Sequence, residues 1–534
     1  MPRANGYREL SSEQAFELEG VWVTAGLADA PNVPPTPLGW DLALDDVVLL
    51  GDALTRRGAS LPRPSRRFAS VAGFGYHALV PLLRAARELL PTDARTLAQA
   101  VACEAMPATS TLDLHKRSPW RSLSLLAARI VRGLSRLEAR VLTHERDASQ
   151  HYRWLVEMDL GILPDDALKT TLAECLAIYR ATREIELEAT LDLVGCHATL
   201  SALMHKLPDA ERQRSASEAL VPDALDLATA TPALALFSAS RRAREEGVMP
   251  SSAEFLSGFG ERAAREREPY APRWAEVPWL LDRALMLLRN LDSRGFEARQ
   301  ARARAERDRR LGRAYQAASA ADALLLKAVV AAGRRTVSLR ARLHVVRART
   351  LFMLRTVVLD MDRRLSRLLG SAPEAAFFMR LQELLESTWR PDPLLSEVTR
   401  ERHAAWRRAC EQPAPPAALG RAARALEEPK SLCGLGLGDG SVSGKVKVAH
   451  DFEDALGLES GGVLVVRSLE PGWAPLWPVA GAIVCDVGGA TSEGVLAAAS
   501  LGIPLLVGTQ HATRTLVDGA TCSVDVTRGC LELT

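Results

Sequence analysis

The most extensive regular pattern in this chain of 534 residues is a helical one. Between Leu79 and Glu428, apolar residues recur at spacings of three and four, as in the segment LSLLAARIVRGLSRLEARVL. Such spacing places the apolar residues on one face of an α-helix. Proline-containing breaks such as GILPDD and VMPSSAE separate these segments. The pattern therefore predicts several long helices packed into one large, mostly helical domain.

A different composition follows Glu428. The Gly-rich stretch EPKSLCGLGLGDGSVSG is typical of a flexible connection. Helical pieces are expected near Asp454 and after Ser492, among short strands, so this part predicts a compact α/β domain. The chain is thus divided into a helical domain (1–411), a linker (412–440) and a second domain (441–534), and residues 1 to about 412 are expected to fold alone. The predicted strands are KVKVAH, GVLVVRS, GAIVCDV, PLLVG, TCSVDV and CLEL.

The bulk composition excludes several classes of protein. A net charge of +2 gives no general attraction to nucleic acid or to anionic membranes. The eight cysteines contain no C-x-x-C pair, which argues against a zinc site or a disulfide framework. No apolar segment has the length of a signal sequence or a membrane span, so we expect a cytoplasmic protein. We predict neither a metal ion nor an organic cofactor.

The first 76 residues are less helical. The Pro-rich segment NVPPTPLGW, Asn32 to Trp40, must be extended or turned, because proline fixes its own φ angle and restricts the residue before it. The segment RFASVAGFGYHAL has the small and aromatic residues of a short strand that enters a helix. This N-terminal part therefore adds extended structure to the helical domain.

The C-terminal domain resembles the swivelling phosphohistidine domain of the phosphoenolpyruvate-utilising enzymes, a family that includes phosphoenolpyruvate synthase, pyruvate phosphate dikinase and rifampicin phosphotransferase. The residues that carry the resemblance follow one another in order along the whole domain. The resemblance implies a multidomain protein of class α plus α/β, with a large substrate-binding domain followed by a small swivelling β/β/α domain. The matching segments are SVSGKVKV, GGVLVV, EPGWAPLWPVAGAIV, GGATSEGVLAAASLGIPLLVG and DGATCSVDVTRG.

The helical part resembles the central substrate-binding region of the rifampicin phosphotransferase branch. Asn32 to Trp40 resembles the Pro-rich opening of that region. Phe259 to Pro278 resembles its Gly-His-Arg-Gly segment, which leads into Glu and then Pro-Arg-Trp. The segment APEAAFFMRLQELL resembles its end. The resemblance implies a cleft for a bulky, lipophilic small molecule.

The departures from the family pattern concern its chemistry. The family carries an ATP-grasp domain before the central region, and the roughly 30 residues before the Pro-rich segment are too few for a domain of ordinary size. The family pattern Gly-Gly-x-x-Ser-His ends here in Glu493, the following Ala-Arg-Glu reads Ala498-Ala499-Ser500 so that the Arg is absent, and Leu469 stands in place of the expected Thr. A carboxylate is a poor substitute for the neutral imidazole nucleophile. We therefore predict that this chain does not form a stable phosphoryl intermediate.

The same exchange occurs in the central region, where the His position of Gly-His-Arg-Gly holds Glu261. Two carboxyl groups thus replace two functional imidazoles, and burial could bring their pKa values towards neutrality. Arg262 and Glu266 are expected to pair, because they are four residues apart. The predicted catalytic residues are Glu261, Glu493, Arg262 and Glu266, and the predicted substrate-binding residues are Trp40, Glu268, Arg273, Trp274 and Ser492.

Three functions fit these observations. The first is a re-purposed phosphotransferase relative that acts on a polyketide-like intermediate of specialised metabolism by acid–base dehydration, cyclisation or isomerisation. The second is a non-catalytic binding, scaffold or resistance protein, in which the two glutamates are remnants. The third is one subunit of a split phosphotransferase whose ATP-grasp domain, or another biosynthetic partner, is a separate protein.

Overall fold

The structure is a computed structural model that places most of the chain. The residues it describes are 8–10, 14, 22–24, 32–63, 68–89, 120–207, 214–249, 251–289, 291–369, 373–386, 392–412, 414–416, 418–419 and 432–533.

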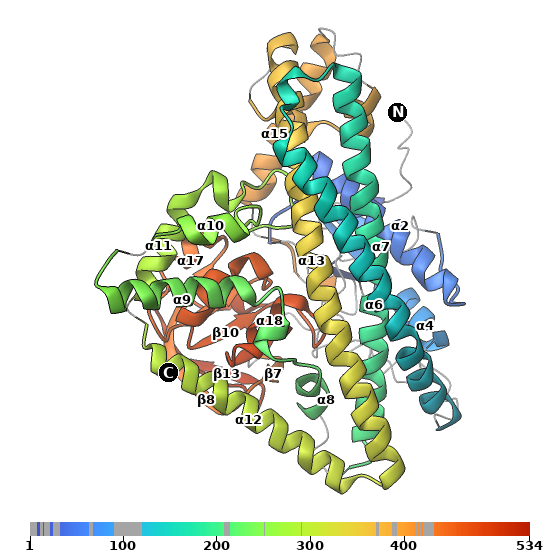
Figure 1. Cartoon of the computed structure of the whole chain (residues 1–534), viewed down its shortest axis with the longest axis vertical. Helices are drawn as coiled ribbons and strands as arrows, with labels where there is room; N and C mark the ends of the chain where they lie inside the picture. The colour runs from blue at the N-terminus through green and yellow to red at the C-terminus, as the bar shows by residue number, and fades with distance from the viewer. Residues whose placement is uncertain are drawn as a thin grey trace.

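Three long helices form the centre of the molecule (Figure 1). They are α6 (Trp120–Glu157), α7 (Asp165–Met204) and α13 (Ala320–Leu369), which lie side by side, with α13 in contact with both others. Helix α7 begins after Pro164 with two aspartates, where the positive end of the helix dipole favours acidic side chains. The predicted long helices are therefore present, and α13 alone has 50 residues.

Shorter helices surround this centre. Helix α2 (Pro37–Arg56) packs on α7, and its first turn is capped by the hydroxyl of Thr36, which accepts from the backbone N–H of Gly39. At the top of the bundle in Figure 1, α15 (Pro393–Glu411) contacts the 3₁₀ turn η6 (Ala375–Phe378), which α2 also contacts. The remaining elements of the helical part are α4 (Leu79–Leu89), η2 (Leu160–Ile162), α8 (Arg214–Ala219), η4 (Ala224–Asp226), α9 (Thr231–Glu246), α10 (Ala253–Phe259), η5 (Trp274–Glu276), α11 (Pro278–Arg289), α12 (Ser293–Ala317) and α14 (Leu381–Glu386).

The C-terminal domain is built on a sheet of strand order β6-β13-β12-β8-β9-β10-β11-β7. Its centre is parallel, and its edges are closed by antiparallel partners. All six strands expected from the sequence are present, and so are the two helical pieces. The elements are β6 (Leu432–Cys433), β7 (Leu435–Leu437), β8 (Ser441–Ala449), α17 (Phe452–Ala455), β9 (Val463–Val466), η7 (Pro471–Val479), β10 (Ala482–Cys485), α18 (Glu493–Ser500), β11 (Leu505–Val507), α19 (Ala512–Thr515), β12 (Thr521–Asp525) and β13 (Cys530–Leu533).

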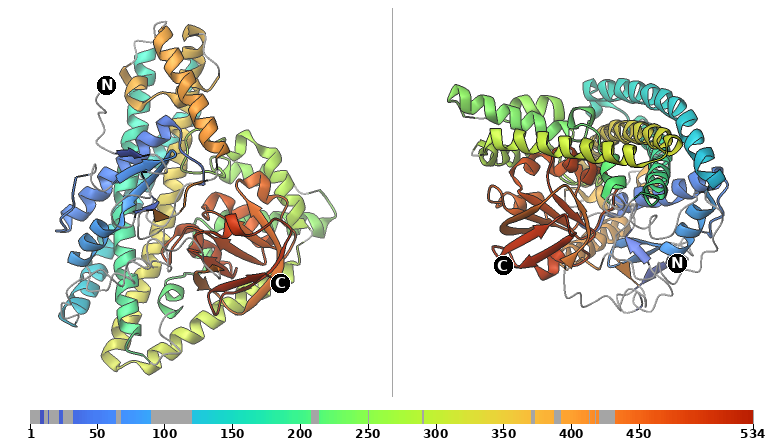
Figure 2. Two further views of the ribbon diagram at one scale, coloured as in Figure 1. Left: turned by 180° about the vertical axis from the view of Figure 1, so that it is seen from behind. Right: turned by 90° about the horizontal axis from the view of Figure 1, so that it is seen from below.

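A second, small sheet lies in the N-terminal part, next to the C-terminal domain (Figure 2). Its strand order is β1 (Arg8–Leu10), β3 (Phe68–Val71), β4 (Phe74–Ala78), β2 (Trp22–Thr24) and β5 (Ala418–Leu419). Within the segment RFASVAGFGYHAL, residues Phe68 to Ala78 form a hairpin, β3 to β4, before α4, rather than a single strand. Strand β5 belongs to the predicted linker, so that segment returns to the start of the chain.

The predicted linker, 412–440, is shorter in the structure. Leu432–Cys433 pairs with β13, and Leu435–Leu437 pairs with β11, so these residues belong to the C-terminal sheet. Glycine is needed here for close approach: a Cβ on Gly436 would lie 1.9 Å from the carbonyl oxygen of Val526. Close strand packing thus accounts for Gly434 and Gly436, whereas Gly438 and Gly440 have positive φ angles that favour glycine.

The helical part and the C-terminal domain share one hydrophobic core. Helices α9 and α11 pack on η7, and a Cβ on Gly472 of η7 would lie 1.9 Å from the carbonyl oxygen of Ala263. Arg299 and Arg307 of α12 donate to backbone carbonyls of the domain, at Ala480 and Ala499. The shared cluster includes Leu236, Leu285 and Phe296 from the helices and Leu476, Trp477 and Leu496 from the domain.

This shared core argues against independent folding of residues 1 to about 412, which stays a prediction to be tested. A protein shortened to residues 1–411 should lose its cooperative thermal transition, because the faces of α9 and α11 that cover η7 become exposed. Circular dichroism during heating, compared with the full-length chain, measures this. A sharp transition at the full-length melting temperature in the shortened protein would show that the helices need no C-terminal domain.

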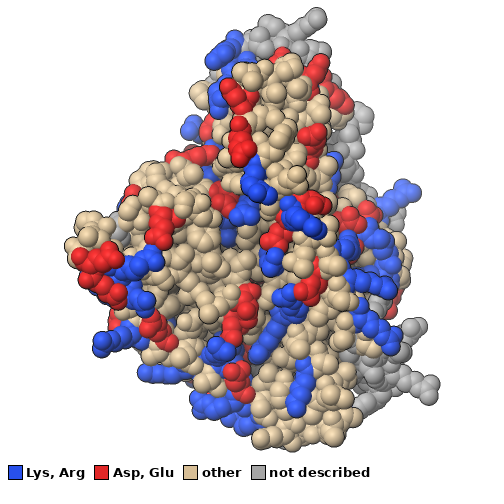
Figure 3. Space-filling view, in the orientation of Figure 1, with Lys and Arg blue, Asp and Glu red and all other residues tan. Residues whose placement is uncertain are grey.

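The surface carries no obvious single-sign field on the face shown in Figure 3, where basic and acidic side chains are interspersed. Within the described part of the chain, none of the helices combines the length and apolar character that crossing a bilayer requires.

Candidate functional site

A cavity of about 120 Å³ lies where the helical part meets the C-terminal domain. Its walls come from α2, α7, α13, the β3–β4 hairpin and the turns before η5, and the C-terminal domain contributes Glu470. The apolar wall includes Trp40, Leu42, Val47, Phe68, Leu187 and Leu351, and the polar wall includes Asn32, Asp46, Arg183, Arg265, Arg267, Glu268, Arg347 and Glu470. A space of this size holds a group about as large as a benzene ring.

Glu470 is the residue that the C-terminal domain presents to this cavity. It precedes η7 and is 7% exposed. Asn32 holds the segment in place: its Nδ2 donates to Glu470 Oε1 at 3.2 Å and to the Ser468 carbonyl at 3.3 Å, and its Oδ1 accepts from the Ser468 N–H at 3.0 Å. Burial raises the pKa of Glu470 to about 7, although Arg267 and Arg265 oppose this shift. Near neutral pH, this carboxyl group can therefore both donate and accept a proton.

Three further charged residues stand around Glu470. Glu268 is buried and accepts hydrogen bonds from the hydroxyl and N–H of Thr36, at 2.8 and 3.2 Å. Burial nevertheless raises the pKa of Glu268. Arg265 and Arg267 line the cavity and act electrostatically on Glu470. The guanidinium of Arg265 has no hydrogen bond or ion pair with any described residue. Around Glu470, the cavity wall thus places two acids with raised pKa values beside two cations.

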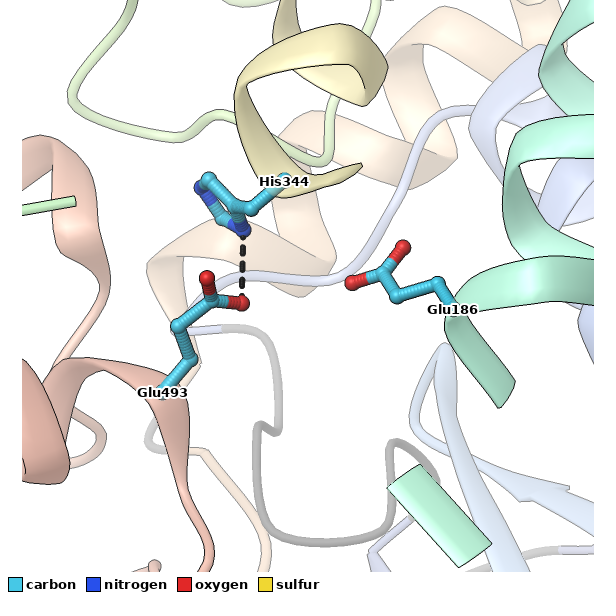
Figure 4. Close-up of side chains that lie close together, drawn as sticks. All are labelled: Glu186, His344 and Glu493. Carbon is cyan, nitrogen blue, oxygen red and sulfur yellow. Dashed lines mark ion pairs between the residues drawn. The ribbon is translucent and has the colours of Figure 1, made fainter. Parts of the chain in front are cut away.

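Beside the cavity, a buried ion cluster joins the two parts of the protein (Figure 4). Glu493 at the start of α18 faces His344 of α13, with 2.9 Å between Glu493 Oε2 and His344 Nδ1. The other ring nitrogen, Nε2, contacts Glu266. Burial alone would lower the pKa of His344, but the Glu493 and Glu266 carboxylates outweigh it and raise the pKa. The two carboxylates therefore favour the protonated form of the imidazole that lies between them.

Arg347 connects this cluster to the cavity. Its Nη1 lies 2.5 Å from Glu186 Oε1, and its Nη2 lies 2.6 Å from His344 Nδ1. The second contact is repulsive when His344 is protonated, and the Glu186 and Glu493 carboxylates offset it. Glu186 also pairs with Arg183, at 2.5 Å. Burial opposes the ionisation of Glu186, but Arg183 and Arg347 hold its pKa well below the ordinary range.

Glu186, His344 and Glu493 each offer one ligand atom, and these atoms lie within 4.8 Å of one another. Such a group could in principle hold a metal ion. However, Arg347 already places a guanidinium against Glu186 and His344. A divalent ion would have to displace this buried cation, so the donor set fits an ion-pair cluster better than a metal centre.

The four residues predicted to be catalytic all lie buried near this junction. Glu266 pairs with the Nε of Arg262 as expected, although on turns and not on a helix. Burial alone would raise the pKa of Glu266, but Arg262 and His344 outweigh it. The pKa falls to about 2, so Glu266 stays ionised near neutral pH. Glu261 Oε1 accepts from Arg349 Nε at 3.0 Å. Glu261, Arg262, Glu266 and Glu493 are not among the residues that line the cavity.

The five predicted substrate-binding residues divide into two groups. Trp40 and Glu268 line the cavity. Trp274 packs in the shared core, with its ring centroid 4.7 Å from that of Phe452. Arg273 is fully buried and donates to the Glu268 carbonyl at 3.3 Å, and Ser492 Oγ accepts from the N–H of Gly489 at 2.8 Å. The last three therefore support the structure around the site and do not line the cavity.

Sequence reasoning missed Glu470, Arg265, Asn32 and His344. A signal existed for Glu470, because it is an acid that directly precedes the apolar segment beginning at Pro471. For Asn32 the signal was its place at the start of the Pro-rich segment. His344 has no such signal, since its two partners come from positions 78 and 149 residues away in the sequence.

Comparison with known proteins identifies the C-terminal domain. Residues 458–529 match the family described as "PEP-utilising enzyme, mobile domain". Phosphoenolpyruvate synthase of Aeropyrum pernix is 44% identical over 97 residues, which are 18% of this chain and 12% of that protein. Chondramide synthase of Chondromyces crocatus is 39% identical over 104 residues, 20% of this chain and 3% of that protein. Rifampicin phosphotransferase of Bacillus cereus is 36% identical over 104 residues, 20% of this chain and 12% of that protein.

The matched segment therefore spans at most 12% of the length of these three relatives, and it corresponds to the C-terminal domain alone. Residues 458–529 therefore belong to the mobile-domain family of the phosphoenolpyruvate-utilising enzymes.

Proposed function

We propose that this protein is a re-purposed relative of these enzymes. It would catalyse acid–base chemistry, namely a dehydration, cyclisation or isomerisation, on a lipophilic intermediate of specialised metabolism. The observation that carries the proposal is Glu470, a buried carboxyl with a pKa of about 7 that lines an otherwise largely apolar cavity. General acids and bases work best when their pKa is near the working pH. Specialised metabolism is suggested by the similarity to chondramide synthase.

One carboxyl group is sufficient for an isomerisation or a proton-driven cyclisation. In its ionised form, Glu470 removes a proton from one atom of the substrate, and the same proton is then returned to another atom. The protein ends in its starting state, and no oxidant or phosphoryl donor is consumed. Trp40, Val47 and Phe68 form the apolar wall that keeps water away from the charged intermediate.

The cavity limits what part of a substrate reacts there. Its volume of about 120 Å³ admits one ring or a short chain. A bulky polyketide-like molecule would place only its reacting end beside Glu470. The cavity is therefore smaller than the cleft for a bulky molecule that the family resemblance implied. The substrate class therefore stays a proposal, with a small lipophilic reacting group as its structural requirement.

The ion cluster argues against phosphoryl transfer through Glu493. Its carboxylate lies 2.9 Å from His344 in a buried site. Attack on a phosphoryl group would bring this anion against a second anion, which repels it, and would break the contact with His344. We expect that incubation with ATP or with phosphoenolpyruvate adds no stable phosphate. Intact-protein mass spectrometry measures this, and a lasting mass increase of one phosphoryl group within residues 488–500 would contradict it.

The function itself is tested with cell extracts. Purified protein is incubated with an extract of a strain that lacks the gene, with and without ATP, and small molecules are followed by mass spectrometry. The proposal expects a product of equal mass, or of mass lower by one water, without ATP. A ligand that is retained unchanged would favour the binding-protein function, and a product that forms only with ATP would favour the split phosphotransferase.

A further inference from the structure

The cavity wall carries a cation whose guanidinium makes no hydrogen bond or ion pair with a described residue. This residue is Arg265, which lines the cavity, is partly buried and acts through its charge on Glu268 and Glu470. Other arginines of the wall are engaged: Arg183 pairs with Asp46 and Glu186, and Arg347 pairs with Glu186. A partly buried guanidinium without an acceptor is costly, because it loses water without gaining hydrogen bonds.

The nearest carboxyl groups do not neutralise this cation. Glu470 accepts from Asn32, and Glu268 accepts from Thr36 and from the N–H of Tyr270. Both acids are buried, and burial raises the pKa of each. The charge of Arg265 thus faces the cavity beside two acids whose ionisation burial opposes.

We propose that the cavity binds an organic anion, a carboxylate or an enolate on an apolar ring or short chain, and that Arg265 anchors its negatively charged oxygen. The apolar part would contact Trp40, Val47, Phe68 and Leu351. This inference rests on the proposed function, since it names the substrate class of the same cavity. The anionic group would lie beside Glu470, where proton transfer to or from a neighbouring atom takes place.

The test is calorimetric binding to the full-length protein near pH 7. The probe is benzoate, which fits the cavity volume, and benzamide is its neutral isostere. We expect saturable benzoate binding that is at least roughly tenfold tighter than benzamide binding, since a charge-assisted hydrogen bond contributes about this much. Arg265→Met should abolish the preference. Arg283→Met is the matched control, because Arg283 lies on the surface in an exposed pair with Glu453.

A second readout distinguishes the cavity from other anion sites. An anion beside Glu470 favours the protonated form of this carboxyl group, so benzoate binding should take up protons from the buffer near pH 7. The binding enthalpy should then depend on the ionisation enthalpy of the buffer. Glu470→Gln should keep benzoate binding and lose this dependence, because glutamine carries no titrating proton.

Three results would overturn the inference: no saturable benzoate binding, equal affinity for benzamide, or an unchanged preference in Arg265→Met. These results are independent of turnover. A protein that prefers benzoate but forms no product in extracts would keep the anion site and lose the proposed reaction, whereas turnover without anion preference would do the reverse.

Discussion

Glu470→Gln is expected to lower turnover of the natural substrate by roughly 10²–10⁴-fold, the usual contribution of a general acid–base group. Glutamine keeps the shape of the side chain and can still pair with Asn32, but it has no proton to exchange. Because the pKa of Glu470 is about 7, the wild-type rate should change with pH through this value. The variant should lack this transition. Product formation is measured by mass spectrometry across the pH range, and folding by circular dichroism.

Glu459→Gln is the control for this experiment, since Glu459 lies exposed on the same domain in a pair with Lys445 at 2.9 Å. It should keep the wild-type rate and pH profile. If Glu470→Gln turns over substrate as fast as the wild type, Glu470 is not the acid–base group, and the binding-protein function takes its place.

Glu186→Ala is expected to destabilise the fold by about 3–5 kcal/mol, the usual cost of removing one partner of a buried ion pair. Arg347 would lose its carboxylate partner, and Arg183 would keep only Asp46, in a site where Glu186 is only 3% exposed. Burial opposes the ionisation of Glu186, but the two arginines lower its pKa strongly, so the pairing is fully present above the ordinary glutamate pKa. It is lost only as the pH falls through the lowered value. The free energy of unfolding in urea at neutral pH measures the effect.

Glu184→Ala provides the comparison on the same helix. Glu184 is 38% exposed and pairs with Arg56 on the surface at 2.9 Å, so its removal should cost less than about 1 kcal/mol. Similar destabilisation by both variants would mean that the buried cluster contributes no more than a surface pair.

The sequence predicted those features that depend on neighbours along the chain. The long helices follow from apolar spacing, and strands such as Val463–Val466 and Ala482–Cys485 follow from short apolar segments between turn residues. The Arg262–Glu266 pair was also predictable, because its two members are four residues apart. Local patterns of this kind need no knowledge of the tertiary structure.

The features that were missed depend on distant segments. Strand β5, at Ala418–Leu419, pairs with Trp22–Thr24, almost 400 residues earlier, and two residues have no recognisable strand pattern. The ionic state of Glu470 depends on burial by the helical part and on Asn32. Gly434 and Gly436 of the predicted linker were misinterpreted as flexible, because flexibility and close strand packing favour the same residue type. Only the three-dimensional structure separates these two causes.

The position of Glu470 at the junction links proton uptake to the docking of the C-terminal domain. Docked, Glu470 is buried beside Asn32, and its pKa is about 7. Any separation of the domain from the helices would return it to water, where a glutamate has a pKa of about 4.3. At a pH between these two pKa values, docking of the domain protonates Glu470, and separation of the domain releases that proton. The strength of the interface must therefore fall as the pH rises through this window, so acidification would act on the domain arrangement even when no substrate is present.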